Sequence, residues 1–131
     1  MTFMGLLDFF KTEETTPDKS FNWFTIKSKE QFQELDRLSK DKLMVIFKHS
    51  TMCPISSMAL KRFQKEADFD TEQVDLFFVN VIDQQAIADA IGEYYGVVHQ
   101  SPQLLIIKDG EAVYHSSHSA VVPSAVNRFL E

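Results

Sequence analysis

Apolar and polar residues alternate along this chain in a pattern that predicts strands and helices in turn. Runs of strand length lie at residues 23–26, 43–47, 74–82, 104–107 and 111–115. Apolar residues recur at helical spacing within residues 28–38, 55–67, 87–95 and 122–130. Strands that alternate with helices predict a parallel sheet with right-handed crossovers. We therefore expect an α/β domain with a central sheet of four to five strands, made mixed by a closing hairpin and flanked by about four helices.

Residues at the ends of these segments support the assignment. Ser28 is a predicted helix N-cap, and Gln31 three positions later completes a capping box. Gly96 is a plausible helix C-cap, and Asp109-Gly110 is a tight hairpin signal. In the helix after residue 54, an apolar stripe runs through positions 55, 59, 63 and 67, with Met58 beside it.

Residues 1–20 differ from the rest of the chain. A short apolar turn near residues 6–10 is followed by a polar run at 12–20, which predicts a tail and linker before one domain at residues 21–131. We expect the tail to dock loosely on the domain; an anchor for a membrane or a partner is the alternative. The apolar part is too short and too acidic for a signal peptide, so we expect a cytoplasmic protein.

Composition and charge narrow the class of protein. The chain has 131 residues, of which 44% are apolar and 24% charged, as in a soluble globular domain. Its formal net charge of −6 argues against nucleic-acid binding. No apolar stretch approaches the roughly 20 residues of a membrane span. The single cysteine, Cys53, excludes an intramolecular disulfide and a structural zinc site built from cysteines.

Cys53 follows the 43–47 strand after a short loop and directly precedes Pro54. Proline fits the first position of a helix, so Cys53 is predicted at a helix N-terminus, where free amides and the helix dipole stabilise a thiolate. Between Asp41 and Glu66 the charged residues are all cationic: Lys42, Lys48, Lys61, Arg62 and Lys65. We expect this local charge to favour an anionic partner near the sulfur. The alternative is a buried cysteine that serves as a small hydrophobe.

Other polar residues allow chemical and structural interpretations. His49, four residues before Cys53, is either a base or thiolate modulator, or a structural residue at a strand end. Ser56 either donates a hydrogen bond to the thiolate or is an ordinary residue of the first helical turn; it cannot form a disulfide. We expect surface or strand positions, and no metal site, for the remaining histidines, which are His99, His115 and His118.

The order of elements and the cysteine motif resemble the thioredoxin fold over residues 21–131. The run FKHST-x-CPIS at residues 47–56 is similar to the monothiol bacilliredoxin family. The resemblance implies that Cys53 is the nucleophile and that Ser101-Pro102 is a substrate-side cis-proline pair; an ordinary trans proline at a strand start is the alternative. The residues expected to contact substrate are Thr51, Met52, Pro54, Ser56, Ser101 and Pro102. Met52 departs from the threonine expected before the cysteine, which bears on thiolate solvation or substrate fit.

The same resemblance implies a monothiol thiol-disulfide oxidoreductase that removes bacillithiol, a low-molecular-weight thiol, from protein mixed disulfides through Cys53. Bacillithiol is then a co-substrate, and no bound cofactor is expected. The expected partners are bacillithiolated proteins and a low-molecular-weight thiol. The alternative is a thioredoxin-like binding or redox-sensing module whose thiol is capped without turnover.

Overall fold

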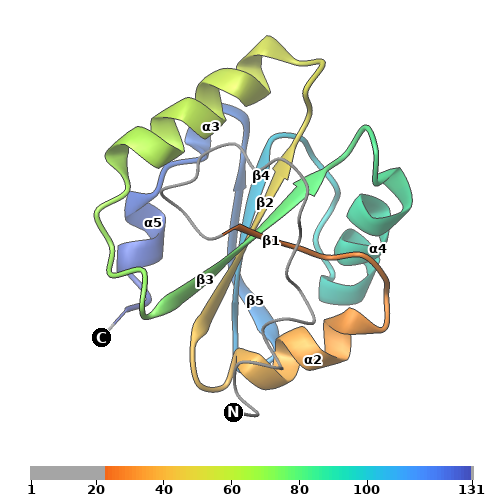
Figure 1. Cartoon of the computed structure of the whole chain (residues 1–131), viewed down its shortest axis with the longest axis vertical. Coiled ribbons are helices and arrows are strands. Elements are labelled where there is room, and N and C mark those ends of the chain that lie inside the picture. Colours follow the sequence, from red (N-terminus) through yellow and green to blue (C-terminus); the bar gives the residue numbers. More distant parts are fainter. Residues whose placement is uncertain (1–22, 131) are drawn as a thin grey trace.

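A five-stranded mixed sheet runs through the centre of the molecule (Figure 1). The computed structural model describes residues 23–130, so the predicted tail at 1–20 lies outside the described residues. The strands are β1 (Trp23–Thr25), β2 (Leu43–His49), β3 (Val74–Asn80), β4 (Gln103–Lys108) and β5 (Glu111–Ser117), in the order β1-β3-β2-β4-β5. The predicted α/β class and mixed sheet are confirmed.

Strand β2 occupies the middle of this sheet. Strands β1, β3 and β2 run parallel, whereas β4 is antiparallel to β2 and β5 is antiparallel to β4. Each residue of β2 is buried, as its continuous apolar run predicts. The carboxyl ends of β2 and β3 and the beginning of β4 therefore share one edge of the sheet. We call it the carboxyl edge; it lies at the top of Figure 1.

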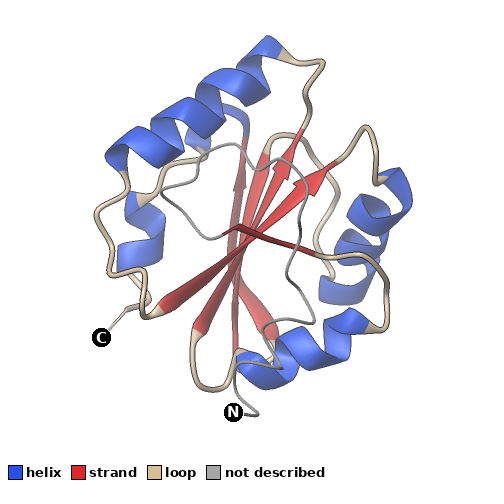
Figure 2. Cartoon of the chain, viewed as in Figure 1, coloured by secondary structure: helices blue, strands red, loops and turns tan. Residues whose placement is uncertain are grey.

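Helices cover both faces of the sheet (Figure 2). The helices are α2 (Gln31–Leu38) and α4 (Gln85–Tyr95) on one face, and α3 (Pro54–Glu66) and α5 (Ser124–Asn127) on the other. Because successive side chains of a strand point to opposite faces, β2 supplies both cores. Met44 and Ile46 pack on the α2/α4 side, and Val45 and Phe47 pack on the α3/α5 side. None of the helices between residues 23 and 130 has the length and apolar character needed to cross a membrane.

Two helices differ from the prediction at their ends. Helix α2 begins at Gln31, with Glu30 as its N-cap instead of the predicted Ser28, because residues 28–30 form a turn. The Gln31 side-chain oxygen accepts hydrogen bonds from the amides of Lys27 and Ser28. The half of the predicted capping box that Gln31 supplies is thus present. No side-chain hydrogen bond caps the N-terminus of α2. The last helix is shorter than the predicted residues 122–130: α5 covers only Ser124–Asn127, and residues 128 and 129 form a turn.

The predicted turns are confirmed at two places. Gly96 ends α4 in the left-handed conformation, with φ of 70°. Asp109 and Gly110 join β4 to β5 with φ of 52° and 78°, which suits a tight hairpin.

Gly92 allows the chain after α4 to return close to the helix. A Cβ atom at this position would lie 2.6 Å from the Val97 carbonyl oxygen and 3.6 Å from the His99 nitrogen. The Val97 amide donates to the Gly92 carbonyl at 2.9 Å. The missing side chain therefore lets residues 97–99 pack against α4 before the chain enters β4.

We predict that Gly92→Ala lowers stability. Overpacking of this kind costs on the order of 1–3 kcal/mol, which exceeds the gain of up to about 1 kcal/mol that alanine brings to a helix interior. Urea unfolding followed by circular dichroism measures the change. The neighbouring exposed substitution Glu93→Ala is the control and should stay within about 0.5 kcal/mol of wild type. A Gly92→Ala protein as stable as this control would contradict the close approach.

Candidate active site

Cys53 lies at the carboxyl edge, where the chain turns from β2 into α3. Its amide donates to the Ser50 carbonyl at 3.2 Å, which closes a turn over residues 50–53. Its backbone is extended, with φ of −119° and ψ of 116°, and Pro54 is the first residue of the helix. Cys53 is half-buried. The predicted placement of Cys53 at a helix N-terminus is confirmed. The alternative of a buried cysteine that serves as a small hydrophobe does not hold, because Cys53 is only half-buried.

The start of α3 is suited to an anion. The first turn carries no acidic residue, and its amide groups point toward the cap position, where the helix dipole is positive. Cys53 itself makes no side-chain capping hydrogen bond. The direct contact that we expected between the sulfur and the free amides is therefore absent.

Ser56 supports the turn at residues 50–53, which we call the cysteine loop, by a hydrogen bond. Its side chain is fully buried, and its Oγ accepts a hydrogen bond from the Ser50 amide at 2.9 Å. The same Oγ lies 2.7 Å from Nδ1 of His49. If Nδ1 is the acceptor, the hydroxyl proton of Ser56 is also satisfied, as a buried donor requires. We expected Ser56 to bind substrate, but its side chain has no exposed surface. Its hydrogen bonds go to Ser50 and His49.

His49 belongs to this support. Its ring packs on Phe78 of β3 with centroids 5.5 Å apart, and burial lowers the pKa of its imidazole below 6.5. The neutral ring that results at pH 7 can accept the Ser56 proton. Among residues 23–130, His49 forms no hydrogen bond with Cys53. The structure therefore connects His49 to the cysteine through Ser56 and the helix start, in place of the direct modulation that the sequence suggested.

The Ser101-Pro102 bond is cis, which confirms the prediction. Because Lys48 of β2 pairs with Gln103 of β4, the proline lies beside the carboxyl end of the cysteine-bearing strand. Pro102 is buried and its carbonyl accepts from the His118 amide at 3.0 Å. Ser101 is half-buried, and its hydroxyl has no hydrogen-bond partner within residues 23–130.

The other expected contact residues lie on the surface. Thr51, Met52 and Pro54 are exposed, and Met52 retains 77% of its accessible surface. Ile55 and Met58 of the predicted apolar helix stripe are also exposed, at 55% and 69%. The start of the helix therefore projects past the core, whereas Ala59 and Phe63 of the stripe are buried and Ala67 is partly buried.

Three of the five cationic residues that are near Cys53 in the sequence have partners of their own in the fold. Lys42 lies at the opposite end of β2, where its Nζ pairs with Asp75 at 2.9 Å. Arg62 donates to the carbonyls of Ser119 and Val121. Lys48 is fully buried and its Nζ lies 3.0 Å from Nδ1 of His99. Neighbours in sequence are therefore divided among different surfaces by the strand and the helix.

Sequence reasoning missed the contact between Lys48 and His99. His99 was expected on the surface or in a strand, but it is a half-buried loop residue that contacts a buried lysine. The available signal was a lysine at the end of the apolar run LMVIFK, where a buried strand has no place for an unpaired charge.

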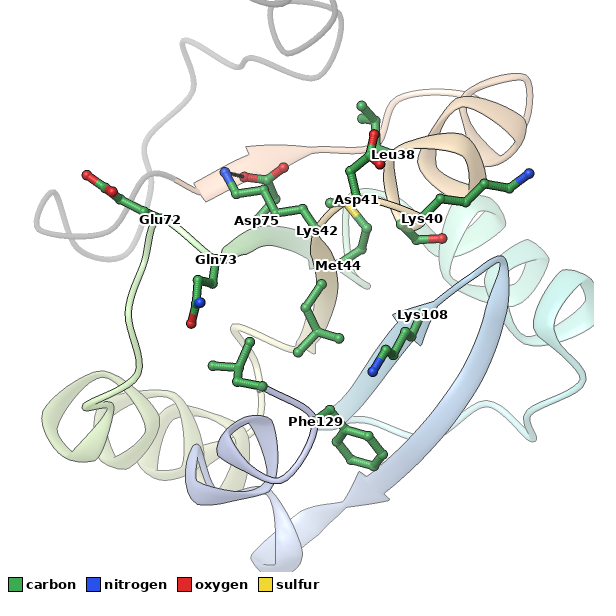
Figure 3. Close-up of a pocket in the computed structure, with 13 residues that line it drawn as sticks. Leu38, Lys40, Asp41, Lys42, Met44, Glu72, Gln73, Asp75, Lys108 and Phe129 are labelled. Atoms are coloured by element: carbon green, nitrogen blue, oxygen red, sulfur yellow. Dashed lines mark hydrogen bonds and ion pairs between the residues drawn. The ribbon is translucent and has the colours of Figure 1, made fainter.

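A cavity of about 470 Å³ lies at the opposite edge of the sheet (Figure 3). Its lining includes Leu43 at the start of β2, Lys108 at the end of β4 and Phe129 near the end of the described chain. The Lys42–Asp75 ion pair forms part of its wall. Since Cys53 follows the other end of β2, this cavity is separate from the thiol chemistry.

We predict that Ser56→Ala destabilises the protein by about 1–3 kcal/mol, because it leaves the buried Ser50 amide and His49 Nδ1 without a partner. Chemical unfolding at pH 7 measures the loss. Ser57→Ala, a neighbouring and less buried serine in the same helical turn, is the matched control and should change stability by less than about 0.5 kcal/mol. Equal effects of the two substitutions would show that the Ser56 contacts contribute nothing.

Known proteins share this fold. The family model for the monothiol bacilliredoxin BrxC matches residues 24–126. A protein described as a candidate oxidoreductase with a thioredoxin fold superposes with a TM-score of 0.66 at 29% identity, covering 82% of this chain and 92% of that one. Thioredoxins from Malassezia sympodialis and Trypanosoma brucei brucei superpose with TM-scores of 0.61 and 0.62. Their identities are 23% and 18%, over 88% of this chain and 92% and 93% of theirs, and they show the fold.

The predicted thioredoxin-like fold is thus confirmed, and the family supports a thiol oxidoreductase role. The family match includes both the cysteine loop and the cis-proline loop, which the fold brings to the same edge of the sheet. The chain belongs to the monothiol bacilliredoxin family.

Proposed function

We propose that this protein removes bacillithiol from protein mixed disulfides, with Cys53 as the nucleophile. The Cys53 thiolate attacks the bacillithiol sulfur, forms a new disulfide with it and releases the substrate protein as a thiolate. A second bacillithiol thiolate then attacks the bacillithiol sulfur on Cys53. This step forms bacillithiol disulfide and regenerates the Cys53 thiolate, so the two electrons come from bacillithiol. Bacillithiol is a co-substrate, and the cycle needs no bound cofactor.

The observation that carries the proposal is the placement of one half-exposed cysteine at the start of α3, in a chain of the bacilliredoxin family. A thiolate is the species that attacks a disulfide, and the positive end of a helix favours it over the thiol. The cis Ser101-Pro102 pair lies beside the end of the cysteine-bearing strand, where the backbone before the proline can offer hydrogen bonds to the incoming disulfide. A reducing compartment such as the cytoplasm suits a protein with a lone thiol.

The step that removes bacillithiol from Cys53 requires a thiol from another molecule. Cys53 is the only cysteine in the chain, so no internal thiol can resolve the mixed disulfide. Ser56, at the position that a second cysteine occupies in a Cys-x-x-Cys loop, is buried and bonded to His49. Turnover therefore depends on an external thiol.

The surface around Cys53 favours a protein as one of the substrates. Met52, Ile55 and Met58 follow one another through the cysteine loop and first helical turns, and each retains more than half of its accessible surface. Exposed apolar side chains grouped in this way are typical of a protein-binding surface, and methionine adapts to partners of different shape.

The catalytic cycle can be tested with a bacillithiolated model protein, by intact-mass measurement of both proteins. We predict that wild type restores many substrate molecules per Cys53 when bacillithiol is supplied. Without bacillithiol, it should restore one equivalent and carry the cap on Cys53. Cys53→Ser should fall to the uncatalysed rate while keeping the unfolding midpoint of wild type. One equivalent restored despite excess bacillithiol would contradict the cycle and favour a sensing module.

A second prediction concerns the protein-binding surface. Replacing Met52 and Met58 together with serine should raise KM for a bacillithiolated protein roughly tenfold, equivalent to about 1.4 kcal/mol of lost apolar contact. KM for a small bacillithiol mixed disulfide should not change. Val113→Ser, which removes an exposed apolar residue of β5, is the control. Equal effects on the protein and the small disulfide would contradict a protein-binding role.

A further inference from the structure

Lys48 is a lysine in the interior of the protein. Its side chain is fully buried on β2, on the same face as Met44 and Ile46 and next to Val79 of β3 and Gln103 of β4. A charge in such a place requires a partner, because transfer from water costs several kcal/mol. An apolar residue would fill this position without that cost, so the presence of lysine calls for an explanation.

His99 is that partner. Nζ of Lys48 lies 3.0 Å from Nδ1 of His99, a distance suited to a hydrogen bond. Burial lowers the pKa of Lys48 to about 8, so the ammonium form predominates at pH 7 and can donate. Burial and the charge of Lys48 lower the pKa of His99 below 6.5, so its ring is neutral at pH 7 and can accept. The two protonation states therefore match.

The loop that contains His99 leads directly to the cis-proline pair. We call residues 97–102 the proline loop. At its start Val97 packs closely against Gly92 of α4. The Gln103 side chain donates to the Val98 carbonyl at 2.9 Å and accepts from the Gln100 amide at 3.4 Å. His99 gives this loop its side-chain link to β2, the strand that ends at the cysteine loop.

We propose that Lys48 is a positioning residue: through His99 it holds the proline loop where Ser101 and Pro102 meet the incoming mixed disulfide. The inference rests on the function proposed above for Cys53. It assigns a role to a residue that touches neither the sulfur nor the substrate. Lys48 sets the distance between the two substrate-binding loops. It precedes His49, the last residue of β2 before the cysteine loop, and it contacts His99 in the proline loop.

Lys48→Met tests this role because it keeps the length of the side chain and removes its charge. In the folded protein the Lys48 pKa lies below the ordinary value of 10.5, so the unfolded state binds more protons between about pH 8 and 10.5. Stability therefore rises with pH through that window, and below pH 8 the burial of the charge opposes folding. We expect Lys48→Met to keep or raise the unfolding midpoint at pH 7. A merely structural role would predict a loss.

The position of the loop is measured first, by hydrogen–deuterium exchange of peptides spanning residues 97–103. Lys48→Met should accelerate exchange in the proline loop several-fold. Lys42→Met is the matched control, because it removes a lysine from the other end of β2 and leaves Asp75 unpaired. This control should lower stability and leave exchange in the proline loop as in wild type. Wild-type exchange of the loop in Lys48→Met would overturn the proposal.

The catalytic consequence is measured with a bacillithiol mixed disulfide as substrate. Lys48→Met should raise KM about tenfold or more with little change in kcat, because the loop that meets the substrate is displaced. A loosened loop with wild-type KM would also overturn the proposal. If wild type shows no turnover, the proposed function fails, and the exchange experiment alone then decides whether Lys48 holds the loop.

A double variant shows whether Lys48 acts through His99. His99→Leu should raise KM to the same extent as Lys48→Met, and it should lower stability because Lys48 loses its partner. The double variant with Lys48→Met should have the KM of either single variant within about twofold, and it should recover the stability that His99→Leu lost. Effects on KM that multiply would show that the two residues act independently. This comparison remains informative if one single variant folds poorly.

The contact should also respond to pH. The ring of His99 faces Lys48 from β2, the side-chain amide of Gln103 lies nearby on β4, and Asp89 and Glu93 of α4 line the surface hollow beside it. Asp89 raises the pKa of both His99 and Lys48, but burial outweighs it at Lys48, and burial together with Lys48 outweighs it at His99. Protonation of His99 removes the acceptor and places two cations together. Loop exchange, corrected for intrinsic rates, should therefore increase in wild type as the pH falls below the ordinary histidine pKa of about 6.5, and it should stay constant in Lys48→Met. A flat wild-type profile would contradict the hydrogen bond.

Discussion

The burial of β2 is the constraint on which the rest of the structure depends. This strand pairs with β3 on one side and β4 on the other, and helices cover both of its faces. Each residue from Leu43 to His49 is buried in consequence. The apolar residues need only neighbours of suitable shape. Lys48 and His49, at the end of the strand, need hydrogen-bond partners inside the protein.

These two residues obtain their partners from opposite sides of the sheet. Lys48 reaches His99 of the proline loop on the α4 side, and His49 reaches Ser56 under the start of α3. Successive residues of a strand point in opposite directions, so one dipeptide can support both loops. The cysteine loop and the proline loop are thereby tied to the same strand. Such a fixed relation is what a site needs when both loops must contact one disulfide.

The same arrangement determines the charge around Cys53. Lys48 is directed into the interior and Lys42 lies at the far end of β2, so these two members of the cationic run do not lie beside the sulfur. The positive end of α3 supplies the favourable field there instead. The surface that remains beside the thiol is apolar, with Met52 and Met58 exposed.

The sequence by itself determined the features that depend on local conformation. Periodicity and turn chemistry located the strands, the Asp109-Gly110 hairpin and the Gly96 cap, because these reflect backbone dihedral angles and near neighbours. Pro54 located Cys53 at a helix start for the same reason. The motif resemblance extended this to the cis bond before Pro102.

Only the tertiary structure decided which polar residues meet. Ser56 was equally compatible with a contact to the thiol, and the packing of α3 on β2 directed it to His49. Lys48 and His99 are 51 residues apart, and strand register together with the close approach at Gly92 brings them together. The physical reason is that burial gives each polar side chain a demand for a partner, which a sequence can indicate. The partner itself depends on which distant segments the sheet and helices place within hydrogen-bond distance.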